Sequence, residues 1–256
     1  MTSEGEPRAN PVVRLGNFFF RSRDALFTAV LLTLFLLFRP QYPRGNEHFD
    51  NLLDLIGIGV ALIGQLLRVA VIGLAYIIRG GSNRRVYAKN LVTAGFFAHS
   101  RNPLYLGNLL VLLGLFLIWN NPWVYLLGGA FFLLGYAAIV AAEEAYLRGK
   151  FGSTYDAYAR AVPRWLPSTR GLGQSLTGMR FNWRRVVVKE YTSMYTWMAG
   201  AVVLLAADTL AYHTYQERTT YLNTLVACFI LLTIGWATAR YLKKSHRLRA
   251  APVSEA

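Results

Sequence analysis

The sequence predicts an all-α protein that crosses a membrane several times. Hydrophobic residues make up 54% of the 256 residues. They gather in runs close to the roughly 20 residues that a bilayer-spanning helix needs. We predict about six spans, followed after the fourth by a cytosolic helix along the membrane surface. The expected spans are Phe18–Phe38, Leu52–Ile78, Leu104–Trp119, Trp123–Ala142, Met194–Tyr215 and Tyr221–Tyr241.

The first span and the link between the third and fourth spans need separate justification. Arg39 and Pro40 follow the first apolar run, where a signal peptide would have a small-residue cleavage site, so we expect a true span. Only Asn120, Asn121 and Pro122 separate the third span from the fourth. A link this short predicts that the two spans form an antiparallel helical hairpin.

The polar segments suggest how the chain is organised. We expect a flexible cytoplasmic arm over residues 1–17, a membrane core over 18–170, and a basic loop with two further membrane helices over 171–256. Aromatic residues recur at spacings of three to five within Glu143–Arg160. This pattern predicts an amphipathic helix at the membrane surface, interrupted near Gly152.

The distribution of charge predicts the orientation of the chain. The formal net charge is +14, with 27 Lys and Arg residues. All of them except Arg39, Arg44, Arg68 and Arg218 fall on the same side of the expected spans, if Arg21, Arg23 and Arg240, which lie at the ends of the first and sixth spans, are counted with that side. The positive-inside rule then places both termini in the cytoplasm. Because topology accounts for the charge, we expect a membrane and no nucleic acid as partner; the compact loops favour a bacterial inner membrane.

The cysteine and histidine content suggests neither a disulfide nor a metal centre. Cys228 is the sole cysteine, so it cannot form an intramolecular disulfide, and we expect it to act as a small apolar residue in the last span. The histidines show no metal-ligand spacing, so we predict no metal site. They are His48, His99, His213 and His246.

Two polar motifs lie at the open ends of the predicted hairpin. SRNPLYLG (Ser100–Gly107) leads into the third span, and EEAYLRGKFGSTYDAYARAVPRWLP (Glu143–Pro167) leaves the fourth. Arg101 and Tyr105 are four residues apart and therefore share a helical face. Polar groups gathered in this way at a membrane surface are typical of a site where a charged ligand meets an apolar one.

The two adjacent acids of the second motif should not play the same part. Side chains of neighbouring helical residues project about 100° apart, so at most one of Glu143 and Glu144 points squarely into a site. A purely structural alternative is an i, i+4 pair between Glu144 and Arg148 at the membrane boundary. A carboxylate that lies opposite Arg101 would instead form a site with this arginine, in which each side chain binds one charge of a zwitterion.

Arg68 lies in the middle of the second expected span. A charge there costs about 2.5 to 3.5 kcal/mol, so such residues usually face a cavity or a partner. We therefore predict a buried role for Arg68, either structural or ligand-facing.

These segments together resemble a known group of enzymes. GQLLRVAVIGLAY, GFFAHSRNPLYLGNLLVLLG and the motif that begins at Glu143 are similar to isoprenylcysteine carboxyl methyltransferases and phospholipid N-methyltransferases, over roughly residues 52–167. The resemblance implies an integral-membrane enzyme that uses S-adenosylmethionine in a cytosol-facing pocket. It also implies a lipid or lipidated substrate that arrives laterally from the bilayer.

The resemblance further implies roles for individual residues. Asn102 stands where the commonest pattern of these enzymes has a histidine. We hypothesise that Glu144 binds the cofactor and that Arg101 or Arg160 orients an anionic substrate group, so Glu144→Gln should lose S-adenosylmethionine binding. The implied catalytic residues are Arg101, Glu144 and Arg160. The implied cofactor-binding residues are Gly95, Asn102, Tyr105, Glu143, Glu144, Tyr155 and Tyr158.

The sequence leaves the methyl acceptor and two other functions open. A carboxylate acceptor needs no general base, whereas an amine must lose a proton, for which Glu143 or Glu144 could serve. A membrane reductase of the sterol-reductase type, using NADPH, would have a similar hairpin. A non-catalytic scaffold or small transporter is the third possibility, although the chain shows no internal repeat. The oligomeric state is also open.

Overall fold

The computed structural model describes residues 10–74, 88, 90–177 and 179–245, and its regular elements are helices, which confirms the predicted all-α class. α1 begins at Pro11, within the segment expected to be a flexible arm, of which residues 1–9 lie outside the described part. The elements are α1 (Pro11–Leu37), η1 (Pro43–Gly45), α2 (Glu47–Leu74), η2 (Gly95–Ala98), α3 (Pro103–Trp119), η3 (Val124–Gly128), α4 (Gly129–Phe151), α5 (Ser153–Ala161), α6 (Leu172–Leu176), α7 (Trp183–Tyr212) and α8 (Thr219–Lys244).

Within the described residues, four helical stretches are long and apolar enough to cross a membrane. They are α2, η3 together with α4, α7 and α8, which correspond to the second, fourth, fifth and sixth expected spans. The second expected span ends at Ile78, outside the described residues. The third expected span, α3, is apolar but has only 17 residues. The first expected span lies in α1, whose first half is interrupted by charged residues. The chain is therefore a polytopic membrane protein, and the number of six spans stays a prediction.

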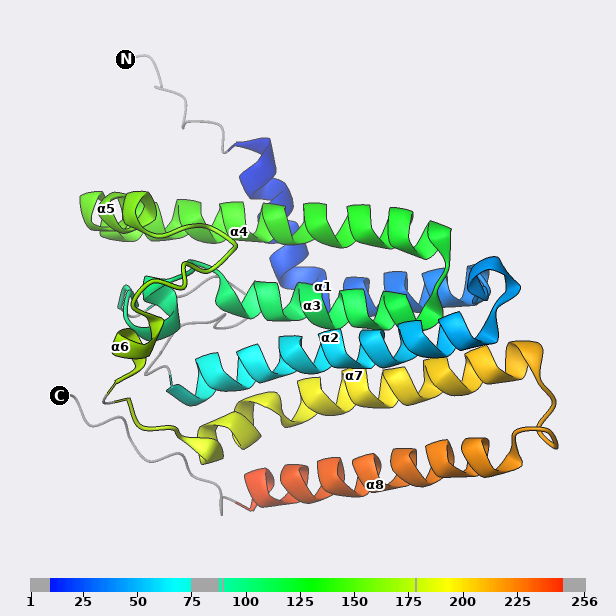
Figure 1. The fold of residues 1–256 in the computed structure, drawn as a ribbon. Helices are drawn as coiled ribbons and strands as arrows, with labels where there is room; N and C mark the ends of the chain where they lie inside the picture. Colours follow the sequence, from blue (N-terminus) through cyan, green and yellow to red (C-terminus); the bar gives the residue numbers. More distant parts are fainter. Residues whose placement is uncertain (1–9, 75–87, 89, 178, 246–256) are drawn as a thin grey trace.

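The long helices form one bundle with two distinct ends. α1 packs on α4, α2 packs on α3, α7 packs on both α2 and α3, and α8 packs on α7. η2, α5 and α6 gather with the start of α3 at one end of the bundle, on the left in Figure 1. The α3–α4 and α7–α8 turns lie at the opposite end. The two predicted polar motifs therefore meet at one end, which we call the polar end.

Asparagines shape the turn of the predicted hairpin. Asn120 ends α3 in a left-handed conformation, with a φ of 43°. The side-chain oxygen of Asn121 then accepts a hydrogen bond from the backbone N–H of Trp123 at 2.8 Å. The side-chain amide of Asn121 donates to the carbonyl of Arg39 at 2.8 Å. The turn is thus capped and tied to the end of α1, as an antiparallel hairpin requires.

Paired glycines let α2 and α3 approach each other at backbone distance. A Cβ atom at Gly57 would lie 2.7 Å from the carbonyl oxygen of Gly114. A Cβ atom at Gly64 would lie 2.6 Å from the carbonyl oxygen of Gly107. Small residues of this kind are what membrane helices use for close packing. The α2–α3 contact fixes the start of α3, which carries the first motif.

We predict that Gly57→Ala destabilises the protein whereas Gly59→Ala, on the same helix, does not. The added methyl group at Gly57 meets backbone atoms of α3, so the helices must separate, at a cost of about 1–3 kcal/mol. A Cβ atom at Gly59 has no neighbour within 4 Å, and alanine favours a helix. Thermal unfolding of both variants in detergent checks this. Equal losses of stability would show that the α2–α3 contact is not rigid.

Candidate functional site

The polar end is built by the segment after α5, which folds back onto the start of α3. The backbone N–H of Arg101 donates to the carbonyl of Pro163 at 2.9 Å. The side-chain amide of Asn102 donates to the carbonyl of Arg164 at 3.0 Å. Asn102 is buried, and here its amide fixes backbone geometry. The two predicted motifs are therefore joined at the polar end.

Glu144 is held between two arginines and is only 5% exposed. Its Oε1 lies 3.1 Å from Nη1 of Arg101 and accepts a hydrogen bond from Nε of Arg164 at 3.0 Å. Its Oε2 accepts a second bond from Arg164, and the bond to Glu144 raises the pKa of Arg164. Arg148 instead donates to Asp156 at 2.7 Å. The alternative of a Glu144–Arg148 pair is therefore wrong.

Glu143 points in a different direction from its neighbour. The hydroxyl of Tyr105 donates to Oε1 of Glu143 at 2.7 Å. Both residues line a large groove, together with Arg101 and Asn102, whereas Glu144 does not line it. Nε of Arg101 is buried and has no hydrogen-bond partner among the described residues. Of the two adjacent acids, it is thus Glu143 that faces the space where a ligand would fit.

The groove has a volume of about 1800 Å³ and runs between α1, α3 and α7. Pockets for single small ligands are usually about 300–1,000 Å³, so this groove has room for a cofactor and an apolar chain together. Its apolar walls include Phe27, Leu31, Phe35, Leu112, Leu115, Phe132, Val203 and Leu204. α7 belongs to the segment expected as an addition to the core, yet it supplies one wall of the groove.

Basic residues gather along the polar part of the groove. A cluster of this kind, close to apolar walls, attracts an anionic group such as a lipid headgroup. The cluster consists of Arg23, Arg101, Arg180, Arg184, Arg185 and Lys189.

Arg68 is engaged by α7 and also lines the groove. Its Nε and Nη2 donate to the two carboxylate oxygens of Glu190 at 2.8 and 2.7 Å, and its Nη1 donates to Asn108. Gln65 donates to Glu190 at 3.2 Å and accepts from the indole of Trp197 at 2.8 Å. The predicted buried role of Arg68 is thus a two-point ion pair between α2 and α7, at the wall of the groove.

The other predicted site residues do not line the groove. Gly95 is buried with a φ of 61°, which favours glycine. Tyr155 packs with Tyr158 in a small apolar cluster, and the Tyr158 hydroxyl donates to the carbonyl of Phe97 at 2.7 Å. Arg160 is on the exposed side of α5. Their proposed parts in cofactor binding and catalysis stay predictions.

Sequence reasoning missed two residues of this region. Arg164, rather than Arg160, reaches Glu144, because the helix breaks at Gly152 and no helical spacing relates the two residues across that break. Glu190 was also missed, because the charge of Arg68 indicated only that this residue faces a cavity or a partner. The available signal was the position of Glu190, which is an acid near the start of an apolar helix.

Comparison with known proteins places the central region in a family. Residues 54–154 match the family described as phospholipid methyltransferase. The protein-S-isoprenylcysteine O-methyltransferase of Schizosaccharomyces pombe is 30% identical over 116 residues, or 43% of this chain and 48% of that protein. This region is therefore similar to the phospholipid methyltransferase family. It contains Arg68, Arg101, Tyr105 and both adjacent acids, and it ends before Arg164.

A second relative carries a different kind of name. The cobalt-zinc-cadmium resistance protein CzcN of Cupriavidus metallidurans is 29% identical over 163 residues, or 60% of this chain and 67% of that protein. The chain therefore spans about two thirds of this relative and about half of the yeast protein. No solved structure matches. The family and the name of the yeast relative both point to a membrane methyltransferase.

Proposed function

We propose that the protein transfers a methyl group from S-adenosylmethionine to a lipid or lipidated acceptor held in the membrane. The observation that carries this proposal is the groove, which joins Arg101, Tyr105 and Glu143 at its polar end to long apolar walls. A soluble, charged donor and an apolar acceptor can therefore meet in one space. The family match supports methyl transfer as the reaction. We propose, from the positive-inside rule, that the polar end and both termini face the cytoplasm, from which the soluble donor would enter.

The side chains at the polar end suit the amino-acid part of S-adenosylmethionine, which is a zwitterion. The carboxylate of Glu143 can accept hydrogen bonds from its ammonium group. The guanidinium of Arg101 can donate to its carboxylate, and the buried Nε of Arg101 offers a donor that no described residue uses. The bound cofactor supplies a methyl group already activated on sulfur. The protein then mainly has to orient the two reactants and exclude water.

The groove walls favour an acceptor with an apolar chain and a negatively charged part. α1, α3 and α7 would take the acyl or prenyl chain, and the basic cluster would hold the anionic group. A carboxylate acceptor would need no general base. An amine acceptor would first lose its proton, and Glu143 is the acid that lines the groove and could receive it.

We predict that Glu143→Gln weakens the binding of S-adenosylmethionine by at least tenfold. A hydrogen bond to a charged group contributes about 1.5–3 kcal/mol, which equals a factor of about 10–150 in affinity. Asp156→Asn is the matched control, because that carboxylate lies on α5 and contacts Arg148 away from the groove. Calorimetric titration of both variants in nanodiscs measures the two affinities. Unchanged affinity in Glu143→Gln would contradict the assignment.

The same titration tests the reaction class. We expect the purified protein to bind S-adenosylmethionine saturably and to show no saturable binding of NADPH. Binding of NADPH alone would favour a reductase, and binding of neither compound would favour a scaffold or transporter. Either result would overturn the proposed function.

A further inference from the structure

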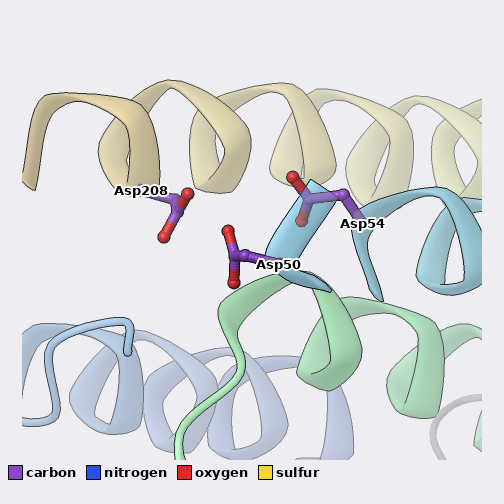
Figure 2. A group of neighbouring side chains, drawn as sticks. All are labelled: Asp50, Asp54 and Asp208. Carbon is purple, nitrogen blue, oxygen red and sulfur yellow. The ribbon is translucent and has the colours of Figure 1, made fainter. Parts of the chain in front are cut away.

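Three aspartates meet at the end of the bundle opposite the polar end. Asp50 and Asp54 come from the first turns of α2, and Asp208 comes from the last turns of α7. Figure 2 shows the three carboxylates turned toward one another between these helices. One oxygen from each lies within 4.8 Å of the others. Asp50 and Asp208 are 2% and 4% exposed, and Asp54 is half-buried.

No basic group among the described side chains forms an ion pair with these aspartates. The neighbouring bases, Arg218 and His213, lie instead against Glu47. Oδ1 of Asp54 and Oδ1 of Asp208 are both buried without a hydrogen-bond partner in the described structure. Bringing bare carboxylates together in a buried site is strongly unfavourable. The carboxylates must therefore be neutralised by protons or by a bound cation, because the described side chains supply no positive charge to them.

A proton shared within the cluster would answer only part of this requirement. It can join two carboxylates, but it does not supply partners for both unpartnered oxygens, which belong to different residues. A divalent cation attracts all three carboxylates at once. Because the donors are all oxygens, the site would favour hard cations such as Mg²⁺, Mn²⁺ or Ca²⁺ over those that prefer thiolate or imidazole.

We propose that Asp50, Asp54 and Asp208 bind one hard divalent cation that fastens the end of α7 to the start of α2. This site is separate from the methyl-transfer groove, since none of the three residues lines it. The Arg68–Glu190 pair holds the same two helices together nearer the polar end. The bound cation would replace repulsion at the other end by attraction. Because α7 forms a wall of the groove, the cation would also fix the position of that wall.

The spacing of the histidines predicted no metal site, and histidine spacing carries no information on a site made of aspartates. Of the four histidines, His246 lies outside the described residues. The proposed ligands come from two helices far apart in the chain, and two of them are simply acids near the start of an apolar helix. No local spacing rule links Asp208 to the other two.

The direct test is binding of Mn²⁺, followed by electron paramagnetic resonance in nanodiscs of neutral lipid. We expect one saturable Mn²⁺ per chain, displaced by excess Ca²⁺ or Mg²⁺. Asp54→Asn and Asp208→Asn should each weaken Mn²⁺ binding by at least tenfold. Glu217→Gln, which changes an exposed acid near the α7–α8 turn, should leave it unchanged. Absence of saturable binding at millimolar Mn²⁺, or equal binding by all variants, would overturn the proposal.

A stability measurement keeps the test decisive if a variant folds poorly. In EDTA, Asp208→Asn should melt at a higher temperature than the wild type, because it removes one repelling charge. Added Mn²⁺ should raise the melting temperature of the wild type and of Glu217→Gln but not that of Asp208→Asn. A lower melting temperature for Asp208→Asn in EDTA, with no effect of Mn²⁺ on the wild type, would show that the carboxylates share protons instead.

Discussion

Replacing Glu190 by alanine is expected to destabilise the protein by about 3–5 kcal/mol, the usual cost of leaving one partner of a buried ion pair unpaired. Both nitrogens of Arg68 that now contact the carboxylate would lose their acceptors, and so would the amide of Gln65. The side chains of Arg68 and Glu190 are only 13% and 3% exposed, so solvent can replace few of the lost oxygens. The pair joins α2 to α7, so the wall of the groove should loosen as well.

Unfolding of Glu190→Ala in detergent, monitored by circular dichroism, measures this loss. Asp24→Ala is the control, because the Asp24 side chain is 99% exposed and pairs with Arg23 at the surface, where a change should stay within about 0.5 kcal/mol. The double change Arg68→Met with Glu190→Leu should recover most of the stability, since it removes both charges together. If Glu190→Ala were as stable as the wild type, the ion pair would not hold α7 in place.

The second large effect is expected for Glu144→Gln, which should lower kcat/KM for methyl transfer by about 100-fold. Glu144 does not line the groove, but it holds Arg101, which does. A displacement of about 1 Å in a positioning group is enough for a loss of this size. We therefore propose that Glu144 acts through Arg101 as a positioning residue. This differs from the direct cofactor contact expected from the resemblance, and we propose Glu143 for that contact.

A double-mutant cycle separates these two roles. If Glu144 acts through Arg101, then Glu144→Gln combined with Arg101→Ala should be little worse than Arg101→Ala alone. Asp156→Asn, which disturbs the exposed Arg148–Asp156 pair, should change kcat/KM by less than about threefold. Additive losses in the cycle would mean that Glu144 contacts a ligand itself.

The parts of the fold that depend on local chemistry could be predicted from the sequence. Long apolar runs predicted the four membrane-length helices, and the short Asn120–Pro122 link predicted the hairpin turn. The interruption expected near Gly152 is present as a break between α4 and α5, where Gly152 has a φ of 52°. Each of these features is set by a few neighbouring residues.

The pairing of distant side chains could not be predicted in the same way. The charge of Arg68 indicated a cavity or a partner, but nothing in the sequence identified Glu190 as that partner. The helix break moved Arg164, and not Arg160, to Glu144. Asp208 meets Asp50 and Asp54 only because α7 packs on α2. Such contacts follow from tertiary packing, which periodicity and spacing do not determine.

The central claim is that the groove brings a methyl donor to a membrane-bound acceptor. Its most direct test is to incubate the purified protein, in vesicles of total membrane lipid, with methyl-labelled S-adenosylmethionine and to follow the label. We predict that label enters the lipid-soluble fraction with the wild type and with Asp156→Asn. With Glu143→Gln, the rate of label incorporation at limiting cofactor should be at least tenfold lower. Label that stays entirely in the aqueous phase with the wild-type protein would contradict the account.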